Sequence, residues 1–228
     1  MKQRFVMTAL LLLLVSLAAC AKLPIIQIPE DSGQIPSQPS CGDLFPKGRW
    51  QMHHAIEATI GGRKTLLTGV TVLSCQDRSI ESALMTVEGF VLFSGRYDGA
   101  LTVDRAVAPF DRPGFAQGLM DDLMLLFFAP RAPLCATGQV DPKDRICRYC
   151  QSNQTTDIVV TTQNTRQIRH YTSRNRLDRS IEAGDIIDVE GTPFAQRMIL
   201  TNHGMLGYQL VLKLLEAVPL KDDRNHRP

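Results

Sequence analysis

The sequence lacks the short motifs that most often place catalytic groups. It contains no Gly-x-Ser-x-Gly, no His-Glu-x-x-His and no glycine-rich phosphate loop. It also lacks an excess of either charge, since 25 Lys and Arg stand against 23 Asp and Glu, and no internal repeat is visible. We therefore expect neither an enzyme, nor a cofactor, nor a nucleic-acid partner.

A hydrophobic run at residues 5–17 is too short to cross a bilayer comfortably. It follows Lys2 and Arg4 and ends in two small residues before Cys20, which is the layout of a cleaved export signal. Removal of Lys2 and Arg4 leaves 23 basic against 23 acidic residues, so the exported chain is formally neutral. An ordinary secretory signal that happens to end at a cysteine is the alternative.

The four residues 17–20, Leu-Ala-Ala-Cys, resemble the lipobox of bacterial lipoproteins. The resemblance implies a signal peptide at 1–19, cleavage before Cys20, and a diacylglyceryl thioether and an acyl chain on that residue. Two acyl signals anchor a protein stably to a membrane. Ala21 stands where an Asp would retain the protein in the inner membrane by the enteric sorting rule, so the resemblance points to the outer membrane.

Composition divides the exported chain into three parts. Residues 20–48 are rich in proline and polar residues and predict an extended tether that holds the body some tens of Å from the bilayer. Residues 49–218 predict one folded domain, rather than two small ones, and 219–228 a charged, frayed tail.

Strand-like segments separated by turn residues dominate the predicted domain. Gly61-Gly62 is a hairpin signal between the first two segments. The last segment alternates as a strand does but is leucine-rich as a helix often is, and we favour a strand. The predicted strands are residues 50–60, 64–74, 79–87, 90–94, 100–107, 157–162, 166–172, 181–189, 194–202 and 208–215.

A helix is predicted from Asp111, as its N-cap, to about Phe128, with Pro113 in its first turn and Pro130 after its end. Its second half is apolar on nearly every side, which requires burial on more than one face. It could be plain core, or it could line a cavity for acyl chains, in part as a lid. The residues predicted to contact such a ligand are Phe115, Leu119, Met120, Leu123, Met124 and Phe127.

Five cysteines follow Cys20, and an exported chain meets an oxidising compartment in which thiols pair. Five is odd, so at least one stays free or pairs elsewhere. We expect residues 131–151 to form a loop with a disulfide among Cys135, Cys147 and Cys150, and a second bridge from Cys41 to Cys75. A redox pair at Cys147 and Cys150, or a zinc site with His170, are the less favoured alternatives.

Isolated histidines and carboxylates offer further candidates, each with a structural interpretation. His53 and His54 point to opposite faces of a strand and cannot share a metal, and His170 and His203 stand alone. Carboxylates at Asp121-Asp122, Asp185 and Asp188 indicate solvated faces rather than an acid–base pair. We predict no metal site.

The lipobox, the proline-rich tether, the consecutive strands and the interrupting apolar helix together resemble the LolA/LolB superfamily of lipoprotein carriers and outer-membrane receptors. The resemblance implies a mostly β fold with a buried helix: a curved antiparallel sheet, or incomplete β-barrel, with a helical lid. It also implies an outer-membrane lipoprotein, facing the periplasm, that binds acyl chains or lipoproteins. A structural accessory subunit of an envelope complex, and thiol chemistry at the Cys147 pair, remain as alternatives.

Overall fold

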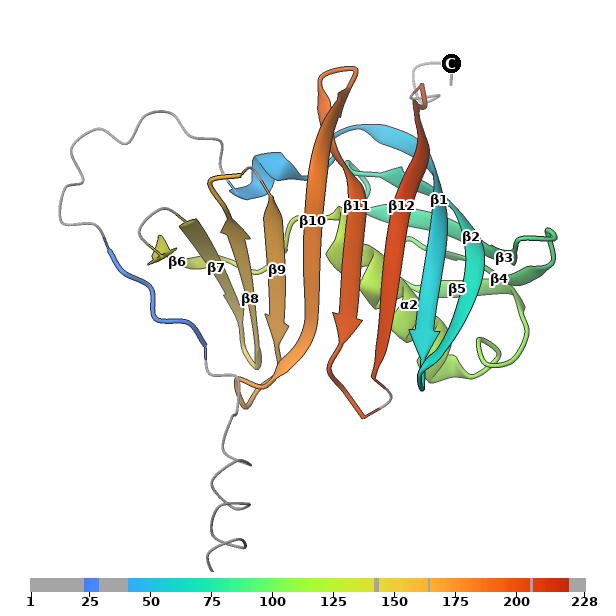
Figure 1. Ribbon diagram of the computed structural model, residues 1–228, viewed down its shortest axis with the longest axis horizontal. Helices are drawn as coiled ribbons and strands as arrows, with labels where there is room; N and C mark the ends of the chain where they lie inside the picture. Colours follow the sequence, from blue (N-terminus) through green and yellow to red (C-terminus); the bar gives the residue numbers. More distant parts are fainter. Residues whose placement is uncertain (1–22, 29–40, 142–143, 164, 206, 222–228) are drawn as a thin grey trace, which may run out of the picture.

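The computed structural model describes residues 23–28, 41–141, 144–163, 165–205 and 207–221. The described chain forms one twelve-stranded antiparallel sheet and one α-helix, α2 (Pro113–Phe127). The sheet curves strongly and partly surrounds α2 (Figure 1). The predicted fold class, mostly β with an open curved sheet and a helix, is confirmed. The predicted signal peptide, residues 1–19, and Cys20 lie outside the described residues.

The strands fall into two consecutive series that flank α2 in the chain. The first series is β1 (Arg49–Ile60), β2 (Arg63–Ser74), β3 (Ser79–Thr86), β4 (Val91–Tyr97) and β5 (Leu101–Ala106). The second is β6 (Leu134–Asp141), β7 (Asp144–Gln151), β8 (Gln154–Val160), β9 (Arg166–Tyr171), β10 (Leu177–Val189), β11 (Thr192–Asn202) and β12 (Tyr208–Pro219).

The strand order places α2 across the hollow of the sheet. The order is β5-β4-β3-β2-β1-β12-β11-β10-β9-β8-β7-β6, so β5 and β6 are the two edges and β1 pairs with β12 in the centre. Because α2 lies between β5 and β6 in the chain, the connection must run from one edge to the other. The position of α2 across the hollow therefore follows from the topology of the sheet as well as from the apolar surface of the helix.

Local signals explain most of the hairpins. Gly61 and Gly62 have φ of 56° and 77°, which glycine adopts without strain, and they close the β1–β2 hairpin between Ile60 and Arg63. The ambiguous last segment is the strand β12, in which Leu212 and Leu214 are buried. Side chains on its alternate positions face out, which is the period of a strand.

The predicted loop at residues 131–151 is wrong, because these residues form the hairpin of β6 and β7. Gly138, interpreted as a loop residue, lies within β6 where residues 23–28 cross it. A Cβ on Gly138 would collide with the side chain of Ile26 and the carbonyl of Gln27. A glycine inside a strand here marks close approach by another backbone.

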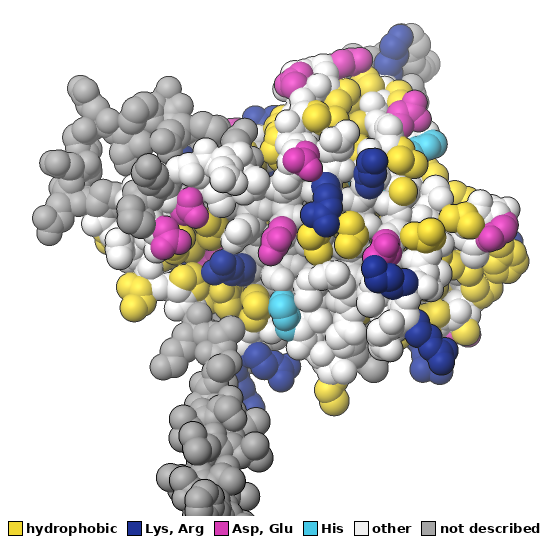
Figure 2. All heavy atoms as spheres, viewed as in Figure 1, with side chains coloured by type: hydrophobic (Ala, Val, Ile, Leu, Met, Phe, Trp, Pro, Cys, Tyr) yellow, Lys and Arg dark blue, Asp and Glu magenta, His cyan; other side chains and the backbone are white. Residues whose placement is uncertain are grey.

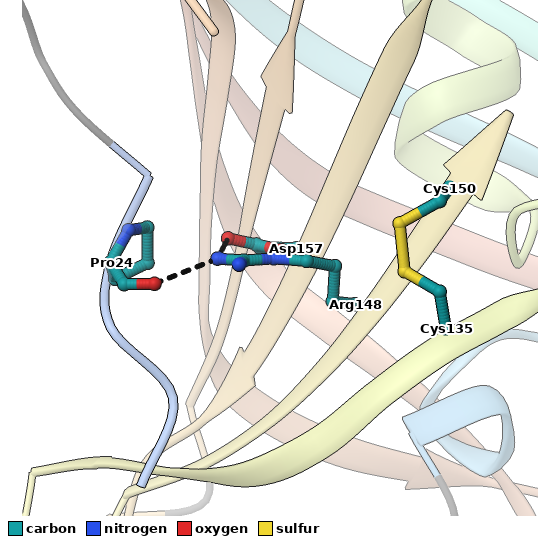
Figure 3. The surroundings of a disulfide bond; sticks show 5 residues. All are labelled: Pro24, Cys135, Arg148, Cys150 and Asp157. Carbon is teal, nitrogen blue, oxygen red and sulfur yellow. Dashed lines mark hydrogen bonds and ion pairs between the residues drawn. A yellow bond between two sulfur atoms is a disulfide. The ribbon is translucent and has the colours of Figure 1, made fainter. Parts of the chain in front are cut away.

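The segment 23–28 is held against the β6 edge of the sheet, although it falls in the predicted tether. Gln27 and Gln139 exchange two backbone hydrogen bonds of 2.8 and 2.9 Å. Arg148 Nη2 donates to the carbonyl of Pro24 at 2.9 Å while the same guanidinium pairs with the buried Asp157 (Figure 3). Pro24 is the fourth residue after Cys20, so an extended chain bridges at most about 14 Å between them. The body is thus held much closer to Cys20 than a tether ending at residue 48 allows.

The folded body also begins before Arg49. A short 3-10 helix, η2 (Cys41–Leu44), leads to Phe45, and Cys41 and Phe45 are buried in the core. Cys41 forms a disulfide with Cys147 of β7. The predicted bridge from Cys41 to Cys75 is therefore wrong, and Cys75 is a free thiol.

The second disulfide joins Cys135 to Cys150 across the β6–β7 hairpin, as expected for a bridge within that cysteine group (Figure 3). Because Cys147 and Cys150 sit in separate disulfides, they do not form a redox pair, and neither thiol is available to bind zinc with His170.

The outer face of the sheet carries charges of both signs. Over β10–β12 and β1, basic and acidic side chains alternate with apolar ones (Figure 2). One neighbouring pair joins Lys64 to Glu57 across the β1–β2 hairpin at 2.7 Å. None of the helices in the described ranges is long and apolar enough to cross a membrane.

Candidate ligand-binding site between α2 and the sheet

The helix α2 packs one face against the hollow and leaves the other partly open. Of the six predicted ligand contacts, Met120, Leu123 and Phe127 are buried, whereas Phe115, Leu119 and Met124 are half-buried. Phe127 lines a small inner cavity and Met124 an outer groove. The others contact neither, and Phe115 instead packs against Phe110, with ring centroids 6.2 Å apart. The six predicted contacts therefore do not line one common cavity: one faces the inner cavity, one faces the outer groove, and four line neither.

The inner cavity has a free volume of only about 10 Å³. That is roughly the space of one water molecule and far below what an acyl chain fills. The hollow is therefore packed in this state, and a ligand enters it only if α2 or the segment 41–47 moves. The cavity is lined by Leu44, Pro46, Met52, His54, Phe127, Arg166, Ile186, Pro193, Phe194, Ala195, Met198 and Leu214.

Two polar side chains interrupt this apolar lining. His54 of β1 is 2% exposed and packs against Phe127, with ring centroids 5.7 Å apart. Burial lowers the pKa of His54 to about 4, with a smaller contribution from His53. His54 is therefore neutral at pH 7.

Arg166, the first residue of β9, is the other polar side chain and is 5% exposed. Its Nη1 donates to the carbonyl of Leu44, and its Nη2 donates to that of Leu126 at 3.3 Å. Its guanidinium lies 4.2 Å from the ring centroid of Phe45. Burial alone lowers the pKa of Arg166 to about 10. The side chain thus links the ends of η2 and α2 to the sheet.

A second cluster holds α2 through Asp122, which is buried rather than on the solvated face we expected. Its carboxylate accepts hydrogen bonds from Arg179 Nε of β10, at 2.8 Å, and from the hydroxyl of Tyr208 of β12. Arg179 also pairs with Asp178 at 2.6 Å. Burial raises the pKa of Asp122, while the hydrogen bonds from Tyr208 and Arg179 oppose that rise. These bonds attach the second half of α2 to β10 and β12.

The N-terminal end of α2 has fewer constraints. Its N-cap is Arg112, whose side chain makes no capping hydrogen bond, so the predicted cap at Asp111 is wrong. The first turn holds no acidic residue to interact with the helix dipole. Gly114 and Gly118 both lie in the helix with open space where a side chain would project. Each glycine lowers helix stability by about 1 kcal/mol relative to alanine.

The outer groove, of about 360 Å³, lies beside the second half of α2 and opens to solvent. Apolar residues of α2 and the following segment form part of it, and mostly polar residues of β7 to β10, together with Arg78, form much of the rest. Within it, His170 Nδ1 and Thr156 Oγ1 share a hydrogen bond of 2.9 Å. The groove is lined by Arg78, Asp121, Asp122, Met124, Leu125, Phe128, Ala129, Pro130, Arg131, Ala132, Tyr149, Gln151, Gln154, Thr156, His170, Asp178 and Arg179.

The remaining sequence candidates lie apart from these spaces. His203 shares a 2.8 Å hydrogen bond with Ser180, and Asp185 and Asp188 are exposed. Cys75 donates its thiol hydrogen to the carbonyl of Pro46, and burial raises its pKa to about 11, which makes it a poor nucleophile. Arg166 was missed by the sequence analysis. Its alternation with the buried Ile168 was a signal, because that period places both on one face of β9.

Comparison with known proteins identifies the architecture. No family model and no curated protein sequence matches the chain. A LolA superfamily protein from Nitrosomonas europaea superposes with a TM-score of 0.51 at 13% identity, over 81% of this chain and 92% of that one. The chain has the LolA fold.

Two further solved structures match this chain with lower TM-scores. A DUF1329 family protein from Desulfovibrio piger has a TM-score of 0.48 at 12% identity, over 77% of this chain and 88% of that one. A putative outer membrane lipoprotein-sorting protein domain from Vibrio parahaemolyticus has a TM-score of 0.47 at 8% identity, over 78% and 90%.

Proposed function

We propose that this chain is a lipid-anchored protein of the outer membrane, facing the periplasm, that binds acyl chains between its sheet and α2. The lipobox-like residues 17–20 support the anchor and the compartment. The LolA fold supports a role in lipid or lipoprotein handling. The observation that carries the proposal is an apolar helix crossing the hollow of an open sheet, held at its C-terminal half and weakly held at its start.

In this proposal α2 is a lid that occupies the ligand site when no ligand is bound. Arg166 and the Asp122 cluster hold its second half. The first turns, with two glycines and no side-chain cap, move most easily away from the sheet. Opening that starts at the first turns and then proceeds along the helix would let an acyl chain replace the side chains of Met120, Leu123 and Phe127 against the sheet, with about 0.8 kcal/mol gained for each buried methylene.

The experiment uses the chain from residue 20 with Cys20→Ser, exported so that both disulfides form. Native mass spectrometry after incubation with a fatty acid, a lysophospholipid and a diacylated lipopeptide detects any complex. We expect a one-to-one acyl adduct that survives gel filtration. Failure of all three ligands to bind would contradict the proposal.

The packed hollow, with about 10 Å³ of free space, favours a second candidate: a structural subunit of an envelope complex with a permanently filled core. For that role we expect a stoichiometric protein complex from native membranes, no acyl adduct, and uniformly slow amide exchange along α2. The lid model instead requires faster exchange in the first two turns of α2 than in its last two.

A further inference from the structure

Arg166 is a buried cation that forms no ion pair with a carboxylate in the described part of the chain. Arg78, at the outer groove, is half-buried and likewise bonds to a carbonyl, that of Ala129, but two other half-buried arginines near the hollow pair with carboxylates. Arg148 bonds to Asp157 at 2.7 Å, and Arg179 to Asp122 at 2.8 Å. Arg166 has the carbonyls of Leu44 and Leu126 and the ring of Phe45 as its partners, and its Nε is buried with no hydrogen-bond partner.

Such an arrangement is costly for a protein that has no use for the charge. A buried cation needs a counter-charge or a full set of hydrogen bonds, and a missing partner costs several kcal/mol. Two backbone carbonyls satisfy Nη1 and Nη2, but the 3.3 Å bond to Leu126 is long and Nε has nothing. The two carbonyls account for Nη1 and Nη2, but they leave the Nε donor of a buried cation free for an anion.

The surroundings of Arg166 define the ligand that fits it. The cavity beside it is apolar apart from His54, which is neutral at pH 7 and cannot balance the charge. Met52 and Met198 line the same cavity, and methionine side chains adapt readily to irregular apolar ligands. One cation at the end of an apolar, adaptable space matches a molecule with one anionic end and a hydrocarbon chain.

We propose that the ligand of the α2 site is a long-chain fatty acid whose carboxylate pairs with Arg166. This inference rests on the acyl-binding function proposed above and specifies its ligand class. The carboxylate would bond to Nε and Nη2 side by side, since a guanidinium presents paired donors that fit two carboxylate oxygens. It would take the place of the Leu126 carbonyl on Nη2, and so binding would release the C-terminal end of α2 from the sheet.

The test compares palmitate, methyl palmitate and palmityl alcohol as competitors of a fluorescent fatty-acid probe on the Cys20→Ser chain. The three ligands have hydrocarbon chains of about the same length and differ in the head group, which is anionic in palmitate and neutral in the other two. We expect palmitate to bind at least tenfold more tightly than either neutral ligand, a difference of about 1.4 kcal/mol. Arg166→Gln should remove this preference, whereas Arg169→Gln, a partly exposed position on the same strand, should keep it.

Each failure has a separate meaning. Equal binding of all three ligands would overturn the fatty-acid assignment and leave acyl binding intact, and no binding by any of them would overturn both. Palmitate preference that persists in Arg166→Gln would overturn the role of Arg166. If that variant does not fold, a pH titration of ¹³C-carboxyl palmitate bound to the parent chain decides. Pairing with a guanidinium must keep the buried carboxylate ionised at pH 7, and a carboxyl resonance that shows a protonated head group at pH 7 overturns the proposal.

Discussion

Acidification should destabilise the protein through His54. Burial lowers the folded-state pKa of His54 to about 4, whereas the unfolded chain titrates near 6.5. Between these values the unfolded state binds more protons than the folded state. The contribution of His54 to the free energy of unfolding is therefore fully present above pH 6.5 and is lost as the pH falls toward 4. The difference corresponds to about 3 kcal/mol at about 1.4 kcal/mol per pH unit.

Roughly 2 kcal/mol of this amount is lost between pH 7 and pH 4.5. Urea unfolding at the two pH values, followed by far-UV circular dichroism, measures the loss directly. His54→Met should flatten the pH dependence by that amount, because a neutral side chain of similar size occupies the same apolar cavity. His203→Gln, at an exposed position, should leave the dependence unchanged and serves as the matched control.

The burial of His170 also lowers its pKa, so part of the acid sensitivity should persist in every His54 variant. The decisive quantity is therefore the difference between the parent chain and His54→Met. If both lose the same stability on acidification, His54 does not titrate as its burial requires and the reasoning fails. Because His54 packs against Phe127, acidification should also speed amide exchange in the last turn of α2.

Three further predictions concern the parts that hold α2 and its surroundings. Asp122→Asn should cost about 2 kcal/mol of stability, since hydrogen bonds to a charged group are lost. In a double-mutant cycle, Tyr208→Phe and Asp122→Asn should show a coupling energy of more than about 0.5 kcal/mol. Strict additivity of the two substitutions would contradict the interaction between Tyr208 and Asp122. Gly118→Ala should raise Tm by about 2 to 4 °C, because a Cβ there meets open space in a helix; a lower Tm would disprove this. Replacing Cys41 and Cys147 by serine together should lower the free energy of unfolding by about 5 kcal/mol for a sequence separation of 106 residues. A change under 1 kcal/mol in urea unfolding would show that the bridge constrains little.

The sequence predicted the helix and all the described strands except β6 and β7, because their signals are local. Gly61-Gly62 closes a hairpin by its own backbone preference, and the apolar run before Pro130 can only be buried helix. In these segments, the residue pattern along the chain is sufficient to determine the local structure. Their positions along the chain could therefore be predicted without knowing what they contact.

The errors arose where a distant segment decides the structure. Residues 131–151 look like a loop, but Cys147 is joined to Cys41 and Gly138 makes room for the chain near Gln27. Asp122 looks solvated from its neighbours, yet its partners lie on β10 and β12. Each of these contacts joins residues more than fifty positions apart. No periodicity within a short window records them.

The filled hollow is compatible with a carrier if loading exchanges one apolar group for another. A chain of about sixteen carbons gains about 13 kcal/mol on burial, at about 0.8 kcal/mol per methylene. Releasing the large buried side chains of α2, namely Met120, Leu123, Leu126 and Phe127, costs about 10 kcal/mol at about 2.5 kcal/mol each. The two amounts nearly cancel, so loading would be reversible and the charge on Arg166 would decide which chains are kept. A preformed empty cavity would bind every acyl chain tightly, whereas a cavity occupied by α2 admits a ligand only when its head group also matches.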